Sequence, residues 1–205
     1  MRIFFTDTNS NLTTEQADKM GVVLIKMPYI YKGTVYYDGD GVSVNEAEIT
    51  TSALNPYEYQ EIFAPYAGNE LIYVSFSHKQ SSTFENLKKA EIPNLTVIDS
   101  ELIEIGQVKV LKRVMNGELY DDIRQFFITD NADKAARISV GGVGLFGVEN
   151  GAAVLLQRYS TADEALAELK RLTNSALTYG KNLNNTLRRH LGKNYVGGVF
   201  EGRIM

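Results

Sequence analysis

This 205-residue chain contains no cysteine and no tryptophan, and histidine occurs only twice, as His78 and His190. The missing cysteine excludes disulfide scaffolds, thiolate metal sites and cysteine nucleophiles. Two histidines leave little material for histidine-based catalysis or for a metal centre. No apolar run approaches the ~20 residues of a membrane span, and the N-terminus turns polar too early for a signal peptide.

The chain also has little net charge, because its 21 Lys and Arg nearly balance its 25 Asp and Glu and leave a net charge of −4. A nucleic-acid partner or an anionic membrane surface would need a clustered cationic footprint, which this balance does not favour. At roughly 100–200 residues per domain, the length allows one domain or two small ones. We therefore expect a soluble cytoplasmic protein with a sizeable core, no nucleic-acid partner and no membrane span.

Predicted strands and helices alternate through the first 117 residues. The predicted strands cover residues 2–6, 22–30, 34–37, 71–76 and 95–98, and the predicted helices begin near residues 13, 55, 84 and 101. A capping-box pattern at Thr13-x-x-Gln16 and the pair Asn55-Pro56 mark two of the helix starts. This alternation is typical of an α/β fold with a doubly wound, mostly parallel sheet.

The pattern changes after Gly117. Strands are predicted at 126–129, 143–148, 152–156 and 195–200, and helices at 161–172 and 175–191. The middle two strands flank Asn150-Gly151, which is a strong hairpin signal. We predict two domains: an α/β domain over residues 1–120 and a small, truncated α+β domain over residues 121–205.

The segment from Gly142 to Gly147 matches the dinucleotide fingerprint Gly-x-Gly-x-x-Gly. That fingerprint works only where its last glycine opens a helix that holds a pyrophosphate. Here Val148 and the Asn-Gly turn follow instead, so we interpret the segment as a glycine-rich hairpin arm.

The aspartate, histidine and arginine residues that could serve in catalysis or metal binding are better explained by structural roles. Four aspartates fit no calcium-loop or two-metal spacing and are assigned to turns: Asp7, Asp38, Asp40 and Asp99. His78 lies in a polar loop without a nucleophile elbow, so a solvated side chain is expected. The run Arg188-Arg189-His190 is interpreted as a solvated basic helix end that complements the helix dipole.

Three clusters of hydroxyl residues at predicted strand ends are candidate ligand-binding residues. Ser81, Ser82 and Thr83 lie between a strand and a helix, where hydroxyls and N–H groups can bind an anion. Capping of the helix by Ser81 or Ser82 is the alternative interpretation. The segments Thr50-Thr51-Ser52 and Thr6-Asp7-Thr8 are similar. Each cluster alone is a turn, but three of them could converge on one pocket.

In this order, the hydroxyl clusters resemble those of the DegV family of bacterial fatty-acid-binding proteins. The similar segments are 6–12, 32–39, 51–52, 77–84 and 97–100, together with the weaker echo Arg137-Ile138-Ser139 and the hairpin and helix from 149 to 172. Any one segment is a weak signal, whereas the ordered series is fairly specific.

The resemblance implies a two-domain fold around a long apolar tunnel, with a fatty-acid carboxylate held at the junction. Carried over by motif, Thr51 and Ser81 would hydrogen-bond the carboxylate. The neighbouring hydroxyl residues complete the expected site: Ser52, Ser82 and Thr83 as further ligand-binding residues, and Thr6, Asp7 and Thr8 as a candidate pocket wall. The chain would then be a carrier rather than an enzyme, without a cofactor, that presents a long-chain fatty acid to a fatty acid kinase.

The chain departs from the DegV pattern in its C-terminal part. Set against the family, this part is shortened and divergent. Nothing after residue 172 matches the family segment that contributes a head-group histidine, so that role is not assigned to His190. Two alternatives follow. One is a divergent DegV-like interaction or regulatory module that has lost lipid binding, and the other is a small-molecule phosphotransfer component that uses the loop from Ser81 to Thr83.

Overall fold

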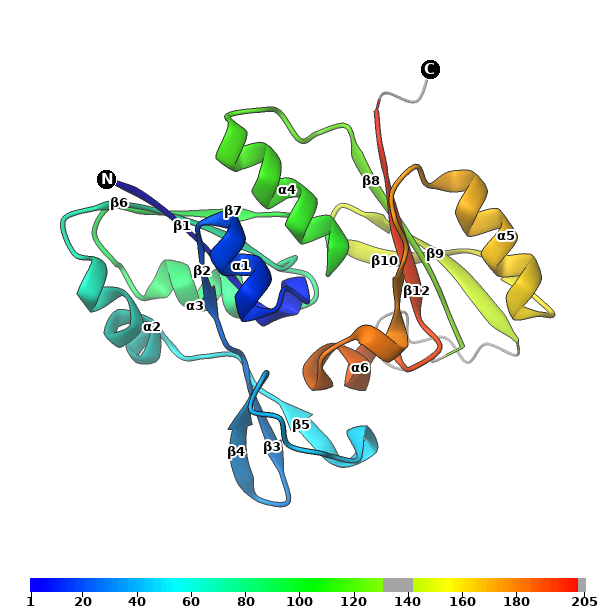
Figure 1. Cartoon of the computed structure of the whole chain (residues 1–205), viewed down its shortest axis with the longest axis horizontal. Helices are drawn as coiled ribbons and strands as arrows, with labels where there is room; N and C mark the ends of the chain where they lie inside the picture. Colours follow the sequence, from blue (N-terminus) through cyan, green and yellow to red (C-terminus); the bar gives the residue numbers. More distant parts are fainter. Residues whose placement is uncertain (131–141, 203–205) are drawn as a thin grey trace.

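The computed structural model describes residues 1–130 and 142–202, and in this part of the chain the strands form three sheets (Figure 1). Sheet A contains, in spatial order, β2 (Val22–Ile25), β1 (Arg2–Asp7), β6 (Glu70–Ser75) and β7 (Leu95–Asp99). All of its neighbouring strands run parallel. The predicted α/β fold with a parallel sheet is therefore confirmed.

Helices cover both faces of sheet A. One face packs against α1 (Thr14–Met20) and α4 (Ile105–Asn116), and the other against α2 (Pro56–Phe63) and α3 (Thr83–Lys89). Both predicted helix starts carry full capping boxes, in which Thr13 pairs with Gln16 and Asn55 pairs with Glu58. These local signals fix where α1 and α2 begin, so their apolar sides meet the sheet.

Sheet B is a small antiparallel sheet that projects below sheet A (Figure 1). Its strands are β4 (Thr34–Tyr37), β3 (Pro28–Tyr31) and β5 (Ile49–Thr51). The prediction of one strand over residues 22–30 is wrong, because the chain leaves sheet A after Ile25. The Met27 N–H donates to the Thr8 hydroxyl at 2.9 Å rather than to the backbone of a neighbouring strand. Pro28 has no N–H with which to continue the pairing.

Sheet C is fully antiparallel, in the order β10 (Ala152–Tyr159), β9 (Val143–Glu149), β8 (Ile123–Thr129), β12 (Val196–Glu201) and β11 (Thr178–Tyr179). The helix α5 (Ala162–Leu172) packs on it through Ala165 and Leu169. The glycine-rich segment forms β9, as expected for a hairpin arm, and Asn150 and Gly151 adopt the left-handed conformation of the turn.

The prediction of a helix over residues 175–191 is wrong for the first half of this segment. That segment contains β11, a 3₁₀ turn η4 (Gly180–Asn182) and then α6 (Asn185–Leu191). Asn184 starts α6 late, because its side chain accepts the Leu187 N–H at 2.9 Å. Gly180 pairs through its N–H with the Tyr195 carbonyl at 2.7 Å, which holds the segment beside β12.

Short 3₁₀ turns connect several elements: η1 (Thr8–Ser10), η2 (Glu46–Glu48) and η3 (Ala64–Tyr66). The largest apolar cluster joins sheet A and α4 to sheet C and α6. At its centre Phe127 stacks on Phe146 with ring centroids 5.0 Å apart. The segment Arg137-Ile138-Ser139 lies outside the described residues. Among the described residues, no helix has both the length and the apolar character to cross a membrane.

Candidate functional site

A cavity of about 380 Å³ opens where sheet A, sheet B, sheet C and α6 meet. Its volume falls in the range of about 300–1,000 Å³ that is typical of small-molecule sites. Its lining includes polar residues: Asn9, Thr51, Ser52, Lys79, Gln80, Ser81, Ser82, Thr186 and His190. The other lining residues are apolar: Met27, Ala53, Phe76, Ile103, Phe127, Ala153, Leu187 and Leu191. The cavity therefore offers both hydrogen-bonding groups and apolar surface to a ligand.

Thr51 and His190 meet in this cavity across 139 residues of sequence. The Thr51 Oγ1 lies 2.8 Å from His190 Nε2. Strand β5 positions Thr51, and α6 positions His190 next to the buried Leu187 and Leu191. The interpretation of His190 as a solvated basic end is therefore wrong. The signal that could have found it is its place beside two leucines four residues apart, which marks the buried side of a helix.

Ser81 lines the cavity and is held by its own loop. Its hydroxyl donates to Thr83 Oγ1 at 3.0 Å and accepts the Thr83 N–H at 3.2 Å. Ser82 occupies the cap position of α3 but makes no side-chain capping bond. Ser81 thus accepts the N–H of the first residue of α3, which is close to the capping role of the alternative interpretation, and it also lines the cavity. The side chain of Thr83 is fully buried.

The cluster Thr6-Asp7-Thr8 is buried and is not among the residues that line the cavity. Thr6 donates to the Val74 carbonyl at 3.0 Å, and Thr8 donates to Asp38 Oδ2 at 3.0 Å. Asp7 accepts the Tyr73 hydroxyl at 2.8 Å and the Asn9 N–H at 2.9 Å. These three side chains are therefore engaged in buried hydrogen bonds, and Asn9 is the residue of this loop that lines the cavity.

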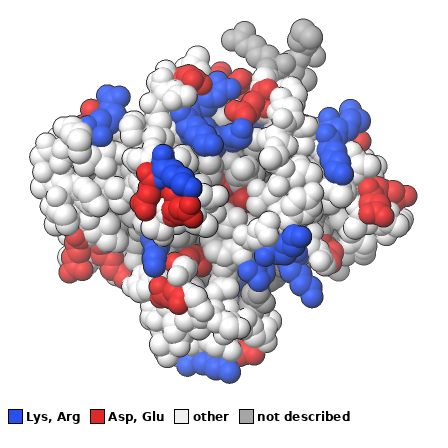
Figure 2. Space-filling model, in the orientation of Figure 1, with Lys and Arg blue, Asp and Glu red and all other residues white. Residues whose placement is uncertain are grey.

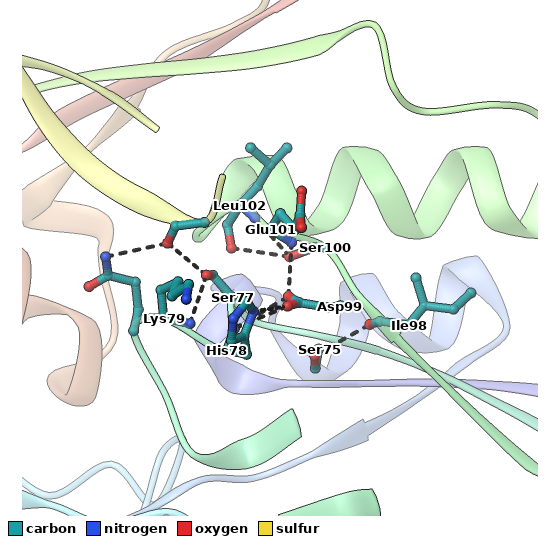
Figure 3. Close-up of polar contacts among 11 residues, drawn as sticks. Ser75, Ser77, His78, Lys79, Ile98, Asp99, Ser100, Glu101 and Leu102 are labelled. Carbon is teal, nitrogen blue, oxygen red and sulfur yellow. Dashed lines mark hydrogen bonds and ion pairs between the residues drawn. The ribbon is translucent and has the colours of Figure 1, made fainter. Parts of the chain in front are cut away.

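The loop that carries Ser81 is anchored at two points (Figure 3). Nδ1 of His78 makes a short contact with the Asp99 carboxylate, so His78 is not the solvated loop residue that was expected. The Ser77 hydroxyl donates to the Gly151 carbonyl at 2.7 Å. These contacts tie the loop after β6 to the end of β7 and to the β9–β10 turn, and so connect sheets A and C at the cavity.

The other aspartates assigned to turns differ in their surroundings. Asp40 accepts the Tyr37 N–H at 2.9 Å in an exposed turn, as expected. Asp38 is buried, and burial raises its pKa although Thr8 and Thr186 donate to it. No group of three or more His, Asp or Glu in the described ranges is arranged to hold a metal ion. On the face shown in Figure 2, Lys and Arg are interspersed with Asp and Glu.

A family model described as the uncharacterised DegV family matches residues 3–123. The chain belongs to the DegV family. The matched segment contains the site residues Thr51 and Ser81, whereas His190 lies beyond it. No curated protein sequence matches the chain.

Solved structures of DegV proteins share the fold over nearly the whole chain. A Thermus thermophilus DegV family protein, described as fatty acid binding, has a TM-score of 0.77 at 14% identity and covers 98% of this chain and 99% of its own. Bacillus subtilis DegV, described as a fatty acid binding protein, has a TM-score of 0.75 at 14% identity, with 97% of each chain covered. A Eubacterium eligens relative loaded with heptadecanoic acid has a TM-score of 0.74 at 11% identity and covers 99% of this chain and 100% of its own.

Proposed function

We propose that this chain binds a long-chain fatty acid in the cavity, with the carboxylate at Thr51 and Ser81 and the acyl chain along the apolar wall. The observation that carries the proposal is that one cavity is lined by the hydroxyls of Thr51 and Ser81, the imidazole of His190 and eight apolar side chains. The relatives from Thermus thermophilus, Bacillus subtilis and Eubacterium eligens, each described with fatty acid binding or a bound fatty acid, support the same ligand class.

The polar part of the cavity suits a carboxylate because it offers several donors. The hydroxyls of Thr51 and Ser81 can each turn a proton toward an anion. His190 already contacts Thr51 and shares the wall with it. Lys79 adds a positive charge to the same wall. Ser52 and Ser82, which line the cavity too, are assigned as neighbouring ligand-binding residues, while Thr83 acts through Ser81.

The apolar wall suits an acyl chain rather than a small polar substrate. Each methylene that leaves water contributes about 0.8 kcal/mol. Phe76, Phe127 and Ile103 come from different elements and face the same space. We extend the proposal to a carrier role in the cytoplasm, in which a partner kinase supplies ATP and acts on the presented acid. The family resemblance is the support for this extension.

Native mass spectrometry tests the proposal. Protein purified from a bacterial host is expected to carry a mass increment equal to a fatty acid, which disappears after delipidation and returns on incubation with palmitate or oleate. Protein without any such adduct that also takes up neither acid would contradict the proposal. That result would favour the alternative of an interaction module without lipid binding.

A further inference from the structure

Ser77 organises the loop that carries Ser81, although it is fully buried and does not line the cavity itself. Three backbone N–H groups of this loop donate to it (Figure 3). The Lys79 N–H donates to its hydroxyl at 3.2 Å, and the N–H groups of Gln80 and Ser81 donate to its carbonyl at 3.0 Å each. Lys79, Gln80 and Ser81 all line the cavity. One buried serine thus fixes the backbone of three consecutive residues of the cavity wall.

These bonds determine what the loop offers to a ligand. The N–H groups of residues 79–81 are satisfied within the protein, because all three are bonded to Ser77. A head group at this part of the wall therefore meets side chains: the ammonium of Lys79, the amide of Gln80 and the hydroxyl of Ser81. The positions of these side chains follow from the backbone that Ser77 holds.

Ser77 is itself held by two other parts of the chain. Its N–H donates to the Leu102 carbonyl at 3.1 Å, in the segment between β7 and α4. Its hydroxyl donates to the Gly151 carbonyl at 2.7 Å, in the β9–β10 turn, and Gln80 Nε2 donates to the same carbonyl at 3.4 Å. The turn can approach this closely because Gly151 has no side chain, since a Cβ there would lie 2.5 Å from the Ser77 hydroxyl oxygen. The position of the sheet A loop thus depends on a turn of sheet C.

We propose that Ser77 is a positioning residue for the ligand head group, and that its hydrogen bond to Gly151 couples the β9–β10 turn to the affinity for a carboxylate. This inference rests on the proposed function, because it needs an anion beside Ser81. A serine that only stabilised the fold would, when removed, weaken charged and uncharged ligands alike. A serine that positions the wall affects a charged head group most, because hydrogen bonds to charged groups are roughly twice as strong as neutral ones.

Dodecanoate and dodecan-1-ol distinguish these two roles, because they have alkyl chains of the same length and differ in the charge of the head group. Displacement of a fluorescent fatty acid at pH 7.5 measures both dissociation constants, and dodecanoate is ionised there, since a carboxyl group in water titrates near 4.3. Ser77→Ala removes the hydroxyl that bonds Gly151 and Lys79. We expect this variant to bind dodecanoate about tenfold more weakly, the effect of one hydrogen bond, and dodecan-1-ol less than about threefold more weakly.

Ser75→Ala is the matched control, because Ser75 is also fully buried and ends the strand from which the loop departs. Its hydroxyl donates to the Ile98 carbonyl at 3.3 Å, within sheet A, and makes no contact with the loop that lines the cavity (Figure 3). The control makes the same chemical change at the same depth. It should therefore retain the wild-type ratio of the two dissociation constants.

Gly151→Ala tests the coupling from the other side of the hydrogen bond. The added methyl group would displace the Ser77 hydroxyl, so this substitution should weaken dodecanoate binding in the wild-type background. In the Ser77→Ala background the hydroxyl oxygen is absent, so the same substitution should weaken binding less. Equal effects of Gly151→Ala in the two backgrounds would overturn the coupling between the turn and the head group.

A Ser77→Ala variant that weakens both ligands equally, or neither of them, would overturn the positioning role. The same holds if Ser75→Ala changes the ratio of the two dissociation constants as much as Ser77→Ala does. Should Ser77→Ala fail to fold, Ser77→Cys replaces it, because a thiol fills the site and is only a weak hydrogen-bond donor. The same preferential loss of dodecanoate binding is then expected. Wild-type protein that binds neither dodecanoate nor the fluorescent fatty acid would instead overturn the proposed function.

Discussion

Glu104 gives the sharpest test of the electrostatics of this fold. It lies just before α4 and is only 2% exposed. The Tyr195 hydroxyl donates to its Oε2 at 3.4 Å, and the Ile105 N–H and the side chains of Thr178 and Asn11 also act to lower its pKa. Burial outweighs these donors and raises the pKa of Glu104 to about 7. The folded protein thus binds a proton at Glu104 more tightly than the unfolded chain does.

A raised carboxyl pKa makes the folded state less stable as the pH rises. The stabilisation is fully present below pH 4.5, the ordinary pKa, and is lost as the pH passes through about 7. Each unit of pKa difference corresponds to 1.36 kcal/mol, so Glu104 alone should remove about 3 kcal/mol of stability between pH 4.5 and pH 8. Glu104→Gln lacks this titration, so its stability relative to the wild type should rise by the same amount.

Urea unfolding of both proteins at pH 4.5 and at pH 8 measures this change. If the amide changes the free energy of unfolding by an amount that does not depend on pH, that amount cancels, because the test compares the stability difference between variant and wild type at the two pH values. Glu101→Gln is the control, since it makes the same carboxylate-to-amide change at an exposed position three residues away; an equal pH dependence in both variants would show that burial of Glu104 is not the cause. A Glu104→Gln difference that stays within about 0.5 kcal/mol at the two pH values would refute the reasoning.

Three further variants test the cavity and its support. Thr51→Ala combined with Ser81→Ala should weaken fatty-acid binding without unfolding the protein, and wild-type affinity in the folded double variant would contradict the head-group assignment. His190→Ala should weaken binding by about tenfold, as expected for one donor to a charged group, with palmitate titration as the measurement. Gly151→Ala should lower stability by about 1–2 kcal/mol, because the residue has a φ of +80° and the added Cβ would lie 2.5 Å from the Ser77 hydroxyl. An unchanged midpoint of thermal unfolding would show that the turn tolerates the methyl group.

Sheet A could be predicted from the sequence because its signals are local. The apolar runs that became β1, β6 and β7 are continuous, and the capping boxes before α1 and α2 fix the helix starts. The first half of the segment from 175 to 191 was wrongly predicted to be helical, because its polar composition suits a helix. Its conformation is set by distant partners, such as the Tyr195 carbonyl that accepts the Gly180 N–H. No pattern within the segment itself contains that information.

The hydroxyl half of the site stands out in the sequence, whereas the imidazole half is indicated there only by the two leucines beside His190. Thr51 ends the short strand β5 and Ser81 lies in the loop after β6, where polar clusters stand out in the sequence. His190 is adjacent to two arginines, and that sequence context indicates a solvated helix end. Only the packing of α6 against the cavity turns His190 toward Thr51. The environment of His78 is likewise set by a distant residue, since its partner Asp99 belongs to the next strand of sheet A.

The composition of the site also determines how the proposed ligand would be held. Hydrogen bonds from Thr51, Ser81 and His190 to a carboxylate contribute about 1.5–3 kcal/mol each, before the cost of ordering these groups is subtracted. A dozen buried methylenes contribute about 10 kcal/mol along the apolar wall. Most of the affinity would therefore come from the acyl chain, while the polar end fixes which way the acid faces. Such a division of roles suits a carrier, because a carrier has to keep its ligand while leaving the carboxylate open to a partner.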